Sequence, residues 1–230
     1  MLKINKLYRL HVKFQKLFFK GRSQSKWFLF SLVLLILLPF PINLFPSYKA
    51  LIFELSLSAV VFFGVQLVSD TMKHFLTGML LGIISVCIIW LDFFRNDLSL
   101  ITILKPITIS LFLTYLSYYL MSFLKKTKII DLNMILLSIS GFLLLGIFGG
   151  QLCHLLHTID TSSFNVDNKN TLFELTYYSF TTLTSLGFGD ILPLTSPARS
   201  LSLIIGLAGE LYITILVAIL VGKYLIQNQS

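Results

Sequence analysis

The stretch that decides the fold is "TTLTSLGFGDILP", which runs from Thr181 to Pro193. Two glycines, Gly187 and Gly189, flank a phenylalanine and are followed by Asp190, a composition that suits neither a helix nor a strand. Long apolar segments precede and follow the stretch in the sequence. A glycine-rich loop between such segments needs a physical explanation, because hydrocarbon offers its backbone groups no hydrogen-bond partner.

The composition of the chain is that of a membrane protein. Of its 230 residues, 56% are hydrophobic and only 12% are charged, which is unlike an ordinary soluble domain. Several segments carry almost no charge and are long enough to cross about 30 Å of hydrocarbon as helices. They are Trp27–Tyr48, Ala50–Ser69, Phe75–Leu91, Pro106–Leu124, Leu132–Ile159 and Ser200–Gly222. We therefore expect an all-α integral membrane protein with six transmembrane helices.

The distribution of basic residues predicts the orientation of the chain. If the N-terminus lies in the cytoplasm, thirteen of the 18 Lys and Arg residues fall in cytoplasmic segments. This is the positive-inside bias of helical membrane proteins. We therefore expect a multi-pass protein of the plasma or inner cell membrane with both termini cytoplasmic. The net charge of +8 is explained by this bias, so the expected partner is the lipid bilayer and no nucleic acid.

A basic cluster, Lys125–Asp131, separates two membrane units in the sequence. Residues 27–124 predict a bundle of four spans, and residues 132–227 predict two spans with a long insertion between them. Residues 1–26 alternate lysines with apolar residues. They predict either an amphipathic helix on anionic lipid or a disordered basic tail that only sets the topology.

The insertion contains a helix that is too short to cross a membrane. The segment "TLFELTYYSFTTL", Thr171–Leu183, has Thr171 and Glu174 at the spacing of a capping box, which marks a helix N-terminus. At 1.5 Å per residue this helix is about 20 Å long. We therefore expect it to enter the membrane and turn back as a re-entrant helix.

The loop after this helix has a composition suited to binding a cation. Gly187 and Gly189 permit backbone angles that other residues avoid, so that successive carbonyl groups can point the same way. A column of carbonyl oxygens can replace the hydration shell of a monovalent cation, and the negative C-terminal end of the short helix also favours one. A closed ring of such oxygens requires several copies around an axis.

The quoted stretch closely resembles the filter signature of potassium channels, in which four T-V-G-Y-G loops form a ladder of carbonyl groups. The resemblance covers residues 132–227 and implies a potassium channel pore domain, with an outer helix, a pore helix, the filter and an inner helix. It implies a homotetramer that conducts K⁺ passively. It also implies no cofactor beyond the permeant K⁺ and no enzymatic activity.

The resemblance assigns roles to individual residues. The residues implied to form the selectivity filter are Ser185, Leu186, Gly187, Phe188 and Gly189, with K⁺ bound at the first four. The residues implied to support the filter are Thr184, Asp190, Tyr177 and Tyr178. Gly209 takes the position of the inner-helix hinge, and Glu210 follows it at the level of the cavity.

The filter departs from the common pattern in ways that leave alternatives open. Ser185 and Leu186 replace threonine and valine, and Phe188 replaces a tyrosine whose hydroxyl braces the filter. We expect a less rigid filter, and a weakly selective monovalent cation channel is the alternative. Thr181 replaces a pore-helix carboxylate of some members, so that water or backbone amides are expected to hold Asp190. An active transporter subunit is disfavoured, because such chains carry four imperfect loops.

Charged residues inside the apolar segments yield three further expectations. Glu54 is expected to pair with a lysine such as Lys49. Glu210 either faces a central cavity, where it would attract cations, or packs between helices. The segment Pro106–Leu124 contains no Arg or Lys and Lys105 stands alone beside it, so a charged voltage-sensing helix is not expected.

Overall fold

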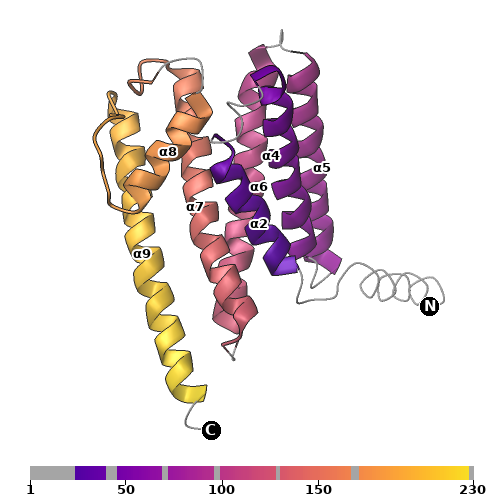
Figure 1. Cartoon of the computed structure of the whole chain (residues 1–230), viewed down its shortest axis with the longest axis vertical. Helices are drawn as coiled ribbons and strands as arrows, with labels where there is room; N and C mark the ends of the chain where they lie inside the picture. Colours follow the sequence, from indigo (N-terminus) through magenta and orange to yellow (C-terminus); the bar gives the residue numbers. More distant parts are fainter. Residues whose placement is uncertain are drawn as a thin grey trace, which may run out of the picture.

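The computed structural model describes residues 24–39, 46–68, 72–95, 99–127, 130–166 and 171–227. In these ranges the regular structure is helical (Figure 1). The α-helices are α2 (Gln24–Leu37), α4 (Lys49–Leu67), α5 (Met72–Phe94), α6 (Ser99–Lys126), α7 (Leu132–Ile159), α8 (Thr171–Leu183) and α9 (Ser196–Gln227), and a short 3-10 helix, η1 (Pro46–Tyr48), precedes α4. The expectation of an all-α chain agrees with these ranges.

Five of the helices, α4, α5, α6, α7 and α9, are long and apolar enough to cross a membrane. The first expected span, Trp27–Tyr48, overlaps α2, which begins three residues earlier, has 14 residues and is shorter than a membrane crossing. The six-span prediction is therefore supported at five positions. Residues 1–23 lie outside the described residues, and with them most of the basic segment 1–26, so both interpretations of that segment stay predictions.

The sequence misplaced the start of α6. Pro106 was expected to begin this helix, but α6 starts at Ser99 and Pro106 lies inside it. A proline inside a helix costs one backbone hydrogen bond, a loss that transmembrane helices tolerate when their neighbours compensate. The apolar residues before Pro106 continue the helix toward its N-terminus. Similarly, α5 extends three residues beyond each end of the expected segment Phe75–Leu91.

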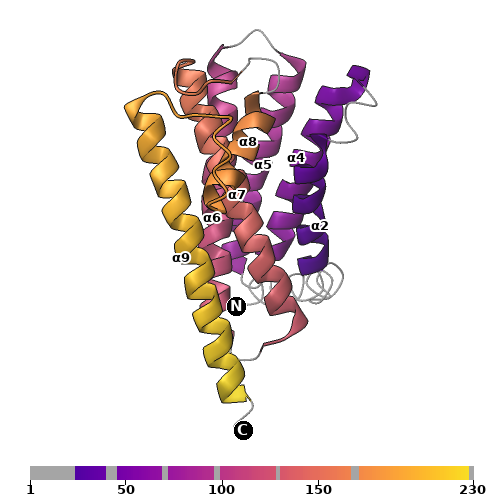
Figure 2. The same ribbon diagram turned by 60° about the vertical axis from the view of Figure 1, so that its left-hand side comes forward.

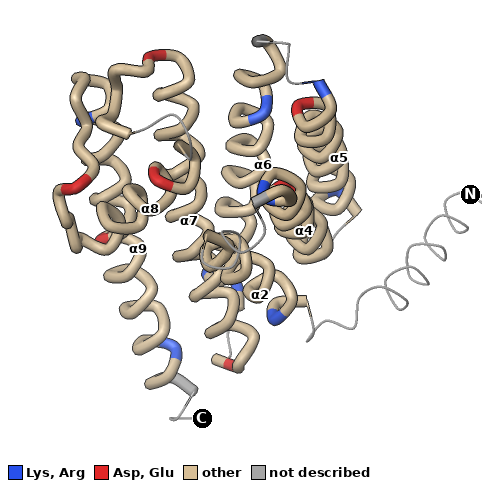
Figure 3. The backbone as a smooth tube through the Cα atoms, turned by 45° about the horizontal axis from the view of Figure 1, so that its top comes forward, with Lys and Arg blue, Asp and Glu red and all other residues tan. Residues whose placement is uncertain are grey.

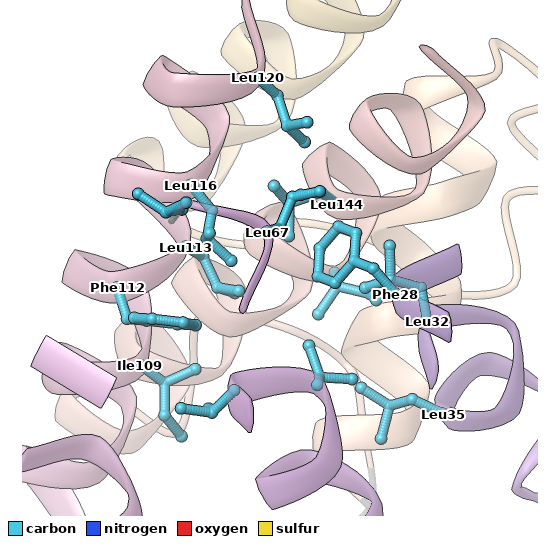
Figure 4. Close-up of a cluster of buried hydrophobic side chains, with 14 of the residues drawn as sticks. Phe28, Leu32, Leu35, Leu67, Ile109, Phe112, Leu113, Leu116, Leu120 and Leu144 are labelled. Carbon is cyan, nitrogen blue, oxygen red and sulfur yellow. The ribbon is translucent and has the colours of Figure 1, made fainter. Parts of the chain in front are cut away.

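An apolar core joins α2, α4, α5 and α6 to α7. Phe28 and Leu32 of α2, Phe112 of α6 and Leu144 of α7 are fully buried and lie in one cluster (Figure 4). Helix α7 also contacts α8 and α9, so it stands between the N-terminal bundle and the last two helices (Figures 1 and 2). The position of α8 therefore depends on α7.

Glycines on α7 allow α8 to approach it closely. A Cβ atom on Gly150 would lie 2.7 Å from the Cα of Thr176, and one on Gly146 or Gly149 would overlap the side chain of Phe180 or Ser179. In addition, the hydroxyl of Ser179 donates to the carbonyl oxygen of Gly146 at 2.8 Å. Small residues on one face of a membrane helix let a second backbone approach. This face of α7 fixes the place of α8.

Charged residues are sparse along the helices (Figure 3), and three of them form a network. The ammonium group of Lys105 on α6 lies 2.5 Å from Glu54 Oε1 on α4 and 2.9 Å from Asp92 Oδ2 on α5. Glu54 is therefore paired with a lysine, as expected, and this lysine is Lys105 on α6. A lysine on a neighbouring helix supplies the counter-charge, because helix packing brings together residues that are distant in the sequence.

Replacing Lys105 with methionine should leave two mostly buried carboxylates without a counter-charge. We expect a loss of roughly 3 kcal/mol in the free energy of unfolding, which is the scale of breaking a buried ion pair. The measurement is the melting temperature of the purified protein in detergent. As a control, Glu54→Gln added to Lys105→Met should recover part of the loss. An unchanged melting temperature in Lys105→Met would contradict the network.

Candidate functional site

The short helix has the predicted bounds, and the chain reverses after it. Helix α8 covers Thr171–Leu183, and the loop that follows returns to the start of α9 on the side from which α8 begins (Figures 1 and 2). Leu175 and Leu183 of α8 are buried with Ile205 of α9 in a second apolar cluster. Helix α8 packs on both α7 and α9, and the loop begins at the end of α8, where Thr184 and Ser185 are exposed.

The sign of the backbone φ angle alternates along the loop. The φ angles of Ser185, Gly187 and Gly189 are 59°, 51° and 78°, whereas Leu186 and Phe188 between them have no positive φ. Alternation in the sign of φ can turn successive peptide groups so that their N–H or carbonyl groups gather on one side of the chain. The two glycines adopt this conformation without steric cost, as the sequence predicted. A column of aligned carbonyl groups requires this alternation.

The base of the loop is bonded to the last turn of α8. The amide of Gly187 donates to the carbonyl oxygen of Thr181 at 3.1 Å. The amide of Ser185 donates to the carbonyl oxygen of Thr182, also at 3.1 Å. Thr184 donates to the carbonyl oxygen of Phe180 from its amide at 3.0 Å and from its hydroxyl at 2.7 Å. These two bonds hold Thr184, the first residue after α8, against the end of that helix.

Tyr177 braces the outer part of the loop. Its hydroxyl donates to Asp190 Oδ2 at 2.8 Å, and its ring stacks on that of Phe188 with centroids 6.4 Å apart and planes 7° apart. The other oxygen, Asp190 Oδ1, accepts from the amide of Ile191 at 3.0 Å. The expected backbone amide is therefore present at Asp190, and the Tyr177 hydroxyl is a partner that the sequence did not reveal.

Tyr178 has a different role from its neighbour. Its side chain is buried, and its hydroxyl lies 2.5 Å from Ser202 Oγ on α9. Its ring also packs edge-on against Phe164, with centroids 5.3 Å apart. In this chain Tyr178 joins α8 to α9 and to the loop before α8, while the contact with Phe188 belongs to Tyr177.

Asn165 is a site residue that the sequence did not identify. Its Nδ2 donates to the carbonyl oxygen of Asp190 at 3.2 Å, and its Oδ1 accepts from the amide of Leu192 at 2.5 Å. The adjacent backbone forms a bridge between Phe164 and Pro193. In the sequence, Asn165 lies in a Ser- and Asn-rich stretch that indicates a loop, and an asparagine there commonly bonds to backbone. The sequence does not indicate that this asparagine bonds to the segment from Asp190 to Leu192.

The loop that contains Asn165 is anchored at the end of α7. Asp160 Oδ1 accepts from the hydroxyl of Ser162 at 2.6 Å and from its amide at 3.0 Å. These hydrogen bonds lower the pKa of Asp160, because they stabilise the ionised carboxylate. Ser163, the next residue, accepts at its carbonyl oxygen from the amide of Leu194 at 2.9 Å. The segment that leads from Asp190 to α9 is therefore tied to α7 through this loop.

Gly209 and Glu210 bring α9 against the base of the loop. A Cβ atom on Gly209 would overlap the carbonyl oxygen of Leu183, so that Gly209 marks a close approach of α9 to the end of α8. The next residue, Glu210, is exposed, and its Oε1 accepts from the hydroxyl of Ser185 at 2.7 Å. Glu210 is thus not packed between the helices of the single chain, and it contacts the loop directly.

One side of the loop is uncovered in a single chain. Leu186 and Phe188 are 63% and 65% exposed, and a Cβ atom on Gly187 or Gly189 would meet no atom within 4 Å. Helix α9 is also exposed, since only 17% of its apolar window is buried. A loop of polar backbone next to membrane-length helices requires cover or an aqueous pathway on that side.

Residues 134–225 match the model of a protein family described as "Ion channel". The match includes α8, the loop after it and nearly all of α7 and α9. Together with the five apolar helices, this similarity supports an ion channel of the membrane. No curated protein and no solved structure is significantly similar to the chain.

Replacing Gly209 with alanine should force α9 away from α8. We expect an overpacking cost of about 1–3 kcal/mol and a loss of ion flux in liposomes. The matched control is Gly206→Ala, one turn earlier on α9, where a Cβ atom would lie 3.7 Å from the nearest atom in ordinary contact. The measurements are the melting temperature and the flux. Equal behaviour of the two variants would contradict the close approach.

Replacing Asn165 with alanine should release the segment after the filter. The variant loses two hydrogen bonds, each worth about 1 kcal/mol, so we expect ion flux to decay at least about tenfold faster during a sustained gradient. The control is Ser162→Ala, which lies in the same loop but bonds to Asp160. The assignment is wrong if Asn165→Ala and Ser162→Ala decay at the rate of the unaltered protein.

Proposed function

We propose that the chain is a subunit of a potassium-selective channel, a homotetramer that conducts K⁺ passively across the cell membrane. The observation that carries the proposal is the positive φ at every second residue, Ser185, Gly187 and Gly189, in a loop that follows a helix too short to span the membrane. The similarity of residues 134–225 to the ion channel family supports it. No covalent chemistry, cofactor or nucleic acid takes part in this function.

The open side of the loop favours assembly of several copies. A single chain supplies one column of carbonyl groups, and a dehydrated cation needs oxygen ligands on all sides. Four copies around an axis would complete the coordination shell and cover the polar backbone that one copy leaves exposed. The same arrangement would pack part of the exposed apolar surface of α9. Closed rotational symmetry is the usual form of such homo-oligomers.

In this proposal the residues divide into ligands and supports. The K⁺ ligands are the oxygens of Ser185, Leu186, Gly187 and Phe188, with Gly189 completing the filter. The residues Thr184, Tyr177, Tyr178 and Asp190 support the filter through the hydrogen bonds and contacts already described. The C-terminal end of α8 faces the base of the filter, and its partial negative charge favours a cation there.

The topology proposed from the sequence fits the same function. The Trp27–Tyr48 segment and five long helices would supply six spans, α8 would be re-entrant, and both termini would be cytoplasmic. The ammonium group of Lys105 is bonded to two carboxylates. This pairing favours a structural role for Lys105 over a role as a gating charge. The segment Pro106–Leu124, which follows Lys105, contains no basic residue, in keeping with that role.

A second function, a weakly selective cation channel of the same architecture, is favoured by one observation. Phe188 has no hydroxyl, so its contact with Tyr177 is a ring stack without a hydrogen bond. A stack fixes the position of an aromatic ring less strictly than a directed bond does. A looser filter would discriminate less sharply between K⁺ and Na⁺.

The deciding experiment is ion flux through the purified protein in liposomes. We expect a K⁺ gradient to drive flux and a matched Na⁺ gradient to drive at least about tenfold less, a difference of roughly 1.4 kcal/mol in barrier. Gly187→Ala, which places a side chain at a φ of 51°, is the inactive control. Equal K⁺ and Na⁺ fluxes would establish the weakly selective alternative. Flux that persists in Gly187→Ala would contradict both functions.

A further inference from the structure

Ser185 is the residue of the filter whose backbone is least favourable. It is the one non-glycine residue with positive φ in the described parts of the chain, at 59°. The left-handed conformation is unfavourable for residues with a Cβ atom, so surrounding contacts must hold Ser185 in place. One such contact is its amide, which donates to the carbonyl oxygen of Thr182 at 3.1 Å.

The second contact comes from the inner helix. Glu210 Oε1 accepts a hydrogen bond from the Ser185 hydroxyl at 2.7 Å, across 25 positions of sequence. The position of Glu210 is itself fixed, because the preceding residue, Gly209, lies against the carbonyl oxygen of Leu183. Ser185 is therefore held from α8 on one side and from α9 on the other.

The chemistry of this bond determines what the Ser185 oxygen can do. A carboxylate only accepts hydrogen bonds, so the hydroxyl must direct its proton at Glu210. Both lone pairs of the hydroxyl oxygen then stay available for a cation. Bonds to an ionised acceptor are also stronger than neutral ones, so the orientation is well defined. With no acceptor at residue 210, the hydroxyl would be free to turn its proton elsewhere.

The geometry points to Glu210 as a positioning residue of the innermost K⁺ site, acting through Ser185. It keeps the Ser185 hydroxyl in the orientation that coordinates K⁺, and any displacement of α9 at Gly209 is transmitted to that site. This inference rests on the proposed channel function. It differs from the expectation that Glu210 acts as a free charge in a cavity. Here the length of the Glu210 side chain, and not its charge alone, determines whether it bonds to Ser185.

Two variants of Glu210 separate reach from charge. Glu210→Asp keeps the negative charge but shortens the side chain by one methylene group, so the bond to Ser185 is lost. Glu210→Gln removes the charge but keeps the length and an acceptor oxygen. The readout is the K⁺/Na⁺ permeability ratio from bi-ionic reversal potentials of the full-length channel. Positioning predicts a ratio about tenfold lower in Glu210→Asp and a smaller change in Glu210→Gln.

The variant Ser185→Ala tests whether the effect passes through the hydroxyl. We expect Ser185→Ala to lower the permeability ratio as Glu210→Asp does, and the double variant to be no worse than either single one. A larger effect in Glu210→Gln than in Glu210→Asp, or additive effects in the double variant, would overturn the inference and indicate action through the field of the charge.

A second measurement applies to any variant that conducts too little for a reversal potential. The melting temperature is compared in K⁺ and in Na⁺, because an ion bound to the folded tetramer stabilises it. We expect the K⁺-specific stabilisation to shrink in Glu210→Asp and to be retained in Glu210→Gln. Equal K⁺-specific stabilisation in both variants and in the unaltered protein would overturn the inference alone. Lack of K⁺ selectivity in the unaltered protein would instead overturn the proposed function.

Discussion

Peptide groups in the loop between α8 and α9 lack the regular hydrogen bonds of a helix, and hydrocarbon cannot supply them. The neighbouring structure answers this constraint. Gly146 and Gly150 on α7 let α8 carry the loop inward, and bonds at the base and the outer end fix its shape. Leu186 and Phe188 of the loop are largely exposed in the single chain. A permeant ion and neighbouring subunits are the partners that we propose for them.

The bonds that shape the loop come from three directions. Tyr177 holds it from α8, Asn165 from the segment after α7, and Glu210 from α9. Each contact reaches a different point, since the first two meet at Asp190 and the third meets Ser185. A change at any of these elements therefore reaches the loop through a defined side chain. The N-terminal helices contact this region mainly through α7, and Phe53 of α4 also packs against Phe173 of α8.

The sequence predicted those parts of the structure that depend on neighbouring residues. The bounds of α8 were predicted because the capping pattern and the following glycines are local signals, and the positive φ angles fall at Gly187 and Gly189 as expected. Contacts between distant positions were not predicted. The partner of Glu54, the role of Asn165 and the bond between Ser185 and Glu210 all depend on how the helices pack. The start of α6 was missed because Pro106 usually marks a helix boundary but is tolerated here.

The bonds that Tyr177, Asn165 and Glu210 make to the loop lie within one chain. These bonds can form as a single chain folds, because none of them requires a second subunit. The conformational entropy that ordering the loop costs is then lost during folding. Association loses correspondingly less entropy, since preorganised partners lose less freedom on binding. In the proposed tetramer, each subunit would contribute a loop that is already folded. A subunit that lacks one of these hydrogen bonds would bring its altered loop into the common pore. One altered chain in four would then suffice to set the behaviour of the whole assembly.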